Sequence, residues 1–217
     1  YPMRPHELVL GKYLASVAFF LVALVSTATV PIMLYYLGRP DWGVIVTSYL
    51  GAFFLGMLFL ALGTFLSALV RDQIVAAVIA LAACFTLYLA GTDFVALPLD
   101  AWVNGLGTFV KKILGVTPHY ESFARGILGL VDISYFLAWS ILFLFLNGMY
   151  LEGRNRPEAR LIFGSGVVLC LVIGMFFSWL IADISQGRID CTEGQIHTVS
   201  PATKTILKRL KVPVEVT

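Results

Sequence analysis

Charged residues are scarce in this chain of 217 residues. Only 13% of them are Asp, Glu, Lys or Arg, whereas about a quarter of the residues of a soluble domain are charged. Apolar residues make up 59% of the sequence, the mean hydropathy is +0.88, and the net charge is only +2. Most charges lie between apolar runs, so no basic face for nucleic acid is formed. These features predict an integral membrane protein that binds no nucleic acid.

Residues that build metal or nucleophilic sites are also few. The three cysteines are Cys84, Cys170 and Cys191. Two lie in apolar runs and one in a polar tail, so we interpret them as free thiols or packing residues. The three histidines, His6, His119 and His197, are far apart and fall on different predicted sides of the membrane. We expect solvated or capping roles for them, and no metal site.

The sequence also lacks a nucleotide-binding loop of the Walker A type. Gly11 and Lys12 could end a Walker A motif, but the position five before Gly11 is His6 and the residue after Lys12 is Tyr13. We therefore expect no catalytic, cofactor or metal site in this chain, and expect any energy for work to come from a partner.

Five long stretches lack Asp, Glu, Lys and Arg. About 20 apolar residues cross a bilayer as a helix, and a spanning segment must satisfy its own backbone groups. The fold class is therefore an all-α integral membrane protein, a polytopic bundle. The expected spans are about 13–37, 44–70, 73–92, 133–151 and 161–182. Pro31 is expected to kink the first.

The loop charges predict the orientation. Cytoplasmic loops carry an excess of Lys and Arg. Starting inside places Arg4, Lys12, Arg71, Arg154, Arg156 and Arg160 in the cytoplasm, against Arg39, Lys111, Lys112 and Arg125 in longer outer loops. Residues 1–12 are then a cytoplasmic amphipathic segment, residues 13–184 the transmembrane domain, and the C-terminal tail is extracytoplasmic.

The outer loop, residues 96–132, is expected to hold short interfacial helices. Apolar residues recur at helical spacing from Leu99 to Leu114, which predicts one amphipathic helix that Gly115 and Pro118 end. A second element is expected from Glu121 to Leu130.

Acidic residues occur at the predicted outer ends of three spans. They are Asp93, Asp132 and Asp183. We expect them to anchor or cap these ends, with a proton or ion relay as the alternative. No predicted span carries a charge at mid-depth, which argues against a proton-coupled pump.

Residues 185–217 differ abruptly in composition from the spans. This polar segment predicts the start of an extracytoplasmic auxiliary domain, truncated here, with Ser200 and Pro201 opening a short basic helix over 202–210. Both ends of the sequence suggest a piece of a longer polypeptide.

Small residues follow one face of the second and third spans and predict close helix packing. They are Gly56, Gly63, Ser67, Ala76 and Ala80. This face could pack within the chain or form a dimer contact. The turn at Arg71 and Asp72 could touch a cytoplasmic partner or be a solvated hairpin tip.

Three segments carry a resemblance to a known family: YPMRPHELVLGKYLAS, RPDWGVIVTSYLGAFFLGMLFLALGTFLSALVRDQIVAAVI and TPHYESFARGILGLVDISYFLAWSILFLFLN. They resemble ABC-2 type transporter permeases of the gliding-motility (GldF-like) kind. The tail RIDCTEGQIHTVSPATKTILKRLKVPVEVT is similar to the opening of the GldG-like auxiliary domain.

The resemblance implies a permease subunit in a prokaryotic plasma (inner) membrane. It would pair with a second copy or a homologue and dock on cytoplasmic ATPase subunits, which would hold ATP and Mg²⁺. The expected ATPase-coupling residues are Arg4, Pro5, His6, Glu7, Gly11, Lys12, Arg71 and Asp72. The second hypothesis is a non-transporting membrane scaffold of a gliding or secretion machinery.

Overall fold

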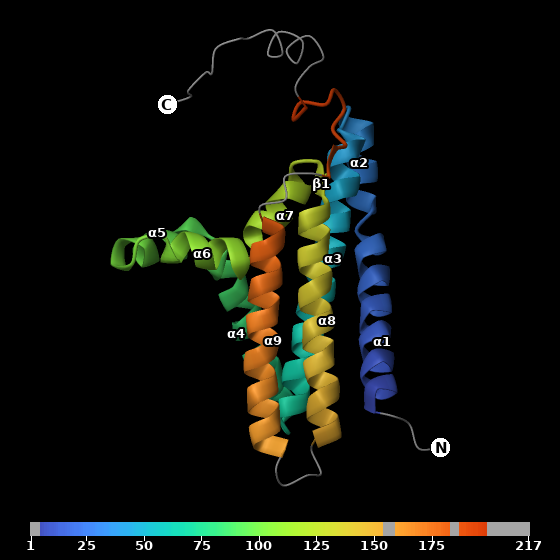
Figure 1. The fold of residues 1–217 in the computed structure, drawn as a ribbon. Coiled ribbons are helices and arrows are strands. Elements are labelled where there is room, and N and C mark those ends of the chain that lie inside the picture. The colour runs from blue at the N-terminus through green and yellow to red at the C-terminus, as the bar shows by residue number, and fades with distance from the viewer. Residues whose placement is uncertain (1–4, 154–158, 183–186, 199–217) are drawn as a thin grey trace.

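The computed structural model describes residues 5–153, 159–182 and 187–198, and most of them are helical (Figure 1). In these ranges five helical segments are long and apolar enough to cross a membrane: His6–Leu37, Trp42–Leu69, Gln73–Ala90, Leu130–Gly153 and Phe163–Ile181. The expected all-α membrane bundle is confirmed. Arg4, Arg154, Arg156, Asp183 and the expected helix over 202–210 lie outside the described residues.

The first span is broken into α1 (Pro5–Ser26) and α2 (Thr29–Leu37). Pro31 has no N–H to donate to the Thr27 carbonyl four residues earlier. That carbonyl accepts from the Val30 N–H at 3.0 Å and from the Tyr49 hydroxyl at 2.9 Å. The expected kink is confirmed. α1 runs without interruption through Gly11 and Lys12, so the described part of the expected segment 1–12 is continuous with the first span.

Two long helices form the centre of the bundle. They are α3 (Trp42–Leu69) and α8 (Leu130–Gly153), which pack on each other, while α1, α4 (Gln73–Ala90) and α9 (Ala159–Ala182) surround them. A side-chain carboxylate caps the start of two helices: Asp41 caps α3, and Asp72 caps α4. Such caps satisfy backbone N–H groups that have no partner inside the helix.

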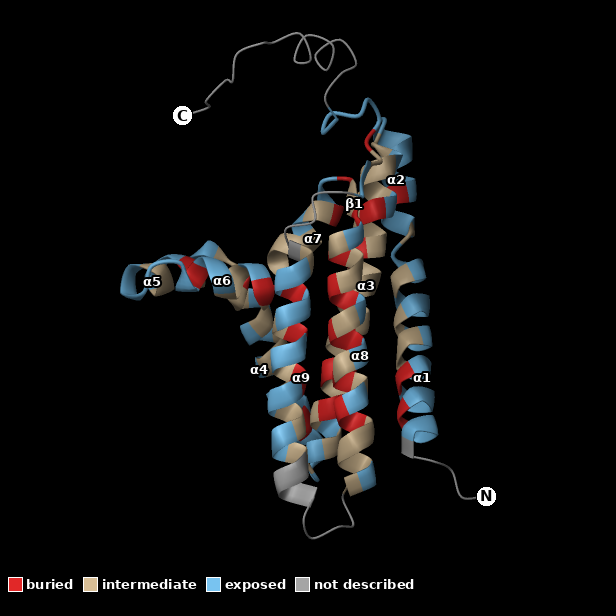
Figure 2. Cartoon of the chain, viewed as in Figure 1, coloured by how far each residue is buried: buried red, intermediate tan, exposed pale blue. Residues whose placement is uncertain are grey.

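The buried core is largely aromatic and lies between α3 and α8. Phe123 and Phe136 are fully buried, and Phe54 contacts both rings. Buried residues follow this seam, whereas the outer faces of α1, α4 and α9 are largely exposed (Figure 2). Apolar side chains exposed along membrane-spanning helices are the surface that hydrocarbon covers.

A helical hairpin projects sideways from the bundle (Figure 1). It consists of α5 (Asp93–Trp102) and α6 (Leu106–Ile113). The expected single helix from Leu99 to Leu114 is therefore wrong. The chain reverses at Gly105, whose φ of 86° lies in the left-handed region that glycine adopts without strain.

The remaining elements gather where the hairpin returns to the bundle. They are α7 (Thr117–Ala124), β1 (Ile127–Gly129) and β2 (Arg188–Asp190), and the two strands pair antiparallel. The expected second element from Glu121 to Leu130 begins earlier, at Thr117, and consists of α7 followed by β1. Pro118 opens α7 rather than ending the preceding helix, a position where its missing N–H costs nothing.

The bundle has a lower and an upper end, which different elements form. At the lower end in Figure 1, α1 begins, α3 and α8 end, and the turn at 70–72 joins α3 to α4. At the upper end lie α2, α7, β1 and β2.

Candidate functional site

The lower end of the bundle contains a large hollow between helices. Its volume is about 1440 Å³, and its walls come from α1, α3, α8 and α9. The polar or cationic side chains in the walls are Lys12, Ser16, Thr64, Ser67, Arg71, Asn147 and Tyr150. Apolar side chains such as Phe59, Leu60 and Phe163 form the rest. We call this space the lower hollow.

Apart from Asp72, the described coupling residues divide into two groups in the structure. Lys12 and Arg71 line the lower hollow. His6, Glu7 and Gly11 are exposed on the first turns of α1, which Pro5 begins. These residues therefore lie at one end of the molecule.

Asp72 has a defined structural role. Its Oδ1 accepts hydrogen bonds from the backbone N–H groups of Ile74 at 2.8 Å and Val75 at 3.1 Å. Together with the exposed Arg71, it forms the tip of the α3–α4 hairpin. The Asp72 carboxylate caps α4. Of this pair, Arg71 lines the lower hollow.

The lower part of α1 is anchored to the bundle through two buried side chains. Val9 and Tyr13 are buried, and the Tyr13 hydroxyl donates to the Met57 carbonyl of α3 at 3.2 Å. The lower hollow opens directly beside this contact, since Leu8, Val9 and Lys12 line it. This end of α1 is thus joined to α3 next to empty space.

The expected small-residue face lies partly inside the molecule. Gly56 has the Phe20 ring of α1 where a Cβ atom would stand, so its packing is within the chain. Ala76 is buried and Ala80 half-buried. A Cβ atom added at Gly63 would meet no atom of the described residues within 4 Å, and both Gly63 and Ser67 line the lower hollow.

Asn147 is a site residue that the sequence reasoning missed. It is 4% exposed in the lower half of α8, and its Oδ1 is buried with no hydrogen-bond partner among the described residues. A buried amide oxygen without a partner is unfavourable. The sequence signal was a lone amide in the apolar run FLFLNGMY.

The upper end holds a buried polar pair instead of a solvated histidine. His119 Nδ1 lies 2.7 Å from Asp132 Oδ1, and each side chain is 12% exposed. The imidazole stacks on the Tyr135 ring at 4.0 Å between centroids. The expectation that His119 is solvated or caps a helix is wrong, because α7 folds its ring against α8.

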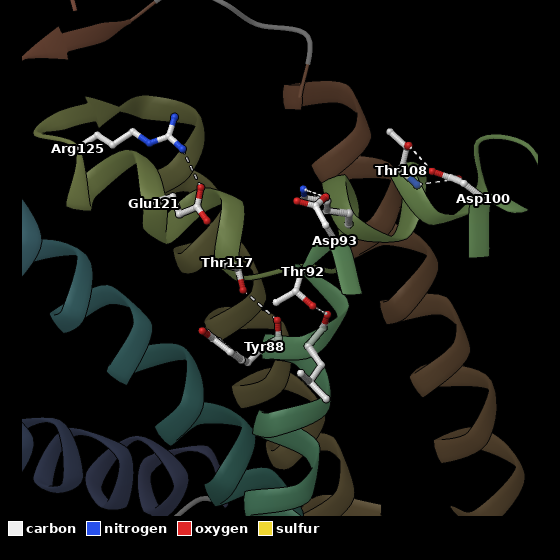
Figure 3. A network of polar contacts seen from close by, with 10 residues as sticks. Tyr88, Thr92, Asp93, Asp100, Thr108, Thr117, Glu121 and Arg125 are labelled. Atoms are coloured by element: carbon white, nitrogen blue, oxygen red, sulfur yellow. Dashed lines mark hydrogen bonds and ion pairs between the residues drawn. The ribbon is translucent and has the colours of Figure 1, made fainter. Parts of the chain in front are cut away.

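Exposed polar contacts brace the hairpin and α7 (Figure 3). Lys111 pairs with Asp93, and Thr117 Oγ1 donates to the Tyr88 carbonyl at 2.9 Å. Asp100 Oδ2 accepts from Thr108 Oγ1 at 2.8 Å, and this bond is the main reason that the pKa of Asp100 lies below its ordinary value. Asp93 thus begins α5 at the surface rather than facing the bundle.

The first residues of the tail are docked on the upper end. Asp190 accepts hydrogen bonds from the Thr192 hydroxyl at 2.6 Å and the Thr198 hydroxyl at 2.9 Å. These bonds, led by the one from Thr192, lower the pKa of Asp190 to about 2. Asp41 Oδ2 accepts from the Glu193 N–H at 3.0 Å, which ties the tail to the start of α3.

Gly43 makes this docking possible. A Cβ atom at this position would lie 1.7 Å from the Cys191 carbonyl oxygen, so only glycine lets the tail approach α3 this closely.

The fold defines the class of the protein, a polytopic helical membrane protein. In the described parts of the chain, no group of three or more His, Cys, Asp and Glu residues could hold a metal ion. Comparison with protein families, with curated proteins and with solved structures finds no match.

Proposed function

We propose that this protein is the transmembrane permease subunit of an ABC-2 type ATP-binding cassette transporter. A partner ATPase would bind ATP and Mg²⁺ and push on the lower end, which would face the cytoplasm. The work would be export across the membrane or a mechanical task. A second copy or a homologue would complete the transmembrane unit.

The lower hollow beside the start of α1 is the observation that supports this function best. Helices can move as rigid bodies only where packing leaves them an alternative position. α1 begins at the surface with His6 and Glu7 exposed, is joined to α3 near Tyr13, and borders a space of about 1440 Å³. A force on its first turns would therefore act on a helix that has room to move.

The distribution of charge supports a role that depends on a partner. Each of the five described segments that could span a membrane has an apolar window of 18 residues. Such spans offer no chain of ionisable groups for proton coupling. Energy supplied by another subunit fits this pattern.

Purification with native neighbours tests the proposal. The full-length protein, solubilised in mild detergent, should recover an ATPase and stimulate its activity. Glu7→Lys at the start of α1 should reduce that stimulation at least fivefold without lowering the melting temperature. Asp93→Lys is the control, because it makes the same charge change on the projecting hairpin at the other end.

Two outcomes would overturn the proposal. One is recovery of the protein without any ATPase partner under conditions that keep membrane complexes intact. The other is an equal loss of stimulation in the Asp93→Lys control. This result would show that the location of Glu7 on α1 has no special role.

One observation favours the alternative, a non-transporting scaffold. Residues 187–198 are held firmly on the upper end by β1–β2 pairing and by the Asp41 contact. A fixed base would suit a domain that binds other proteins. ATP-dependent movement of a substrate in vesicles that contain the protein and its ATPase would exclude this alternative.

A further inference from the structure

The lower hollow continues upward along α1. A second space of about 550 Å³ is lined by Ala15, Ser16, Phe19, Phe20, Ala23 and Leu60. Ala15, Ser16 and Leu60 line both spaces. The two therefore form one groove, which runs from the lower end toward the middle of the bundle between α1 and α3.

The wide end of this groove is cationic. Lys12 reaches it from α1, and Arg71 reaches it from the α3–α4 turn. Among the described residues that line it, none is Asp or Glu. Two cations without an acidic neighbour in the wall attract a phosphate, which arginine and lysine both bind well.

An uncompensated polar atom lies in the same wall. Asn147 is 4% exposed, and its Oδ1 has no hydrogen-bond partner among the described residues. A ligand hydroxyl at the wide end of the groove could donate to this oxygen. The site thus combines attraction for an anion with an acceptor for a hydroxyl group.

The narrow end of the groove is apolar and has the length of a lipid chain in one leaflet. Phe19, Phe20 and Ala23 line it, and Phe20 packs over Gly56. At a rise of 1.5 Å per residue, the stretch of α1 from Lys12 to Ala23 is about 16 Å long. Half of the hydrocarbon core measures about 15 Å.

We propose that this groove is a binding site for an anionic glycerophospholipid of the phosphatidylglycerol class. Lys12 and Arg71 bind its phosphate, the Asn147 Oδ1 accepts from a glycerol hydroxyl, and one acyl chain lies along Phe20 and Ala23. Basic pockets at the ends of transmembrane helices are suited to such headgroups. The inference rests on the groove itself and does not depend on an ATPase partner.

Native mass spectrometry of the full-length protein in detergent tests the headgroup charge. The probes are dioleoyl phosphatidylglycerol, phosphatidylethanolamine and phosphatidylcholine. We expect the first to bind at least tenfold more tightly than either zwitterionic lipid. The double variant Lys12→Gln with Arg71→Gln should reduce this preference below threefold.

The matched control removes two cations from the upper end. Arg39→Gln with Arg125→Gln changes the net charge equally and should keep the tenfold preference. Equal loss in both double variants would mean nonspecific attraction and would overturn the proposal. So would equal binding of all three lipids by the unchanged protein, the result expected if another protein segment fills the groove.

A second comparison tests the hydroxyl contact. Phosphatidylmethanol carries the same charge as phosphatidylglycerol but lacks a headgroup hydroxyl. The unchanged protein should bind phosphatidylglycerol at least threefold more tightly than phosphatidylmethanol. Asn147→Leu should abolish this difference while it keeps the preference for anionic over zwitterionic lipid, which also shows that the variant is folded. A difference that persists in Asn147→Leu would overturn the assignment of Asn147.

Discussion

The two ends of the bundle are built in opposite ways. At the upper end, the His119–Asp132 pair joins α7 to α8, and strand pairing and the Asp41–Glu193 hydrogen bond hold the tail. At the lower end, α1 meets α3 near Tyr13 beside a space of about 1440 Å³. Polar contacts join the elements at one end, whereas the other end contains open volume between helices. The movement of α1 that we propose requires this difference.

The largest expected effect comes from breaking the buried pair at the upper end. Asp132→Ala leaves His119 without its partner, and removing one member of a buried pair costs about 3–5 kcal/mol of unfolding free energy. Asp93→Ala is the control, because the Asp93–Lys111 pair is exposed and exposed pairs contribute about 1 kcal/mol or less. Equilibrium unfolding in mixed micelles measures both. Equal losses would contradict the contrast between buried and exposed contacts.

Two glycines allow the next comparison between the ends. Gly43→Ala places a methyl group against the Cys191 carbonyl and should displace the tail. If the free energy that holds the tail against α3 falls by about 1.4 kcal/mol, the maleimide labelling rate of Cys191 rises about tenfold. Gly63→Ala meets no neighbour within 4 Å and should leave labelling unchanged. Unchanged labelling in Gly43→Ala would show that the tail is not held at this contact.

Acidification should loosen the turn that Asp190 stabilises within the tail, where it also accepts from the Thr192 and His197 N–H groups. The pKa of Asp190 is lowered to about 2, so its stabilising bonds are fully present above the ordinary aspartate pKa of about 3.9. They are lost as pH falls through that range toward 2. Hydrogen exchange of the Thr192 and His197 amides, corrected for intrinsic pH dependence, should increase in this window. Asp190→Asn should show fast exchange already at pH 7, and protection in that variant would contradict the assignment.

The smallest effect is expected at the lower end. Tyr13→Phe removes the hydrogen bond to the Met57 carbonyl, which corresponds to about 1 kcal/mol of unfolding free energy. Tyr36→Phe is the control, since the Tyr36 side chain is 81% exposed. A loss in Tyr13→Phe as large as that in Asp132→Ala would mean that the lower end is fixed as firmly as the upper end.

The spans could be predicted from the sequence because the bilayer sets their length. Charge-free runs of the required length have no competing structure in lipid, and the described helices match them. The break near Thr27 was also predictable, because Pro31 removes one specific hydrogen bond.

Contacts between distant segments could not be predicted in the same way. β1 and β2 are three residues each and pair across a long separation in sequence, so neither carries its own signal. His119 and Asp132 meet because α7 folds back on α8, and their spacing of 13 residues follows no helical repeat. The hairpin reversal had a missed signal, the turn dipeptide Asn104–Gly105.

The candidate site, like the fold, could be predicted from the sequence only in part. The lower-end location of Lys12 and Arg71 follows from the order of the spans. The lower hollow does not, because empty volume depends on how side chains from several helices fit together. Asn147 gains its role only because it lies in the wall of that hollow.

Distances measured between spin labels test the central claim most directly. One pair replaces Gly11 of α1 and Glu152 of α8 at the lower end, and the other replaces the exposed Val46 and Leu130 at the upper end, in a variant that lacks the native cysteines. In a complex with the ATPase that we propose as the partner, locked with a non-hydrolysable ATP analogue, the lower distance should change and the upper distance should not. A lower distance that stays constant in the locked complex, or equal changes at both ends, would contradict the account.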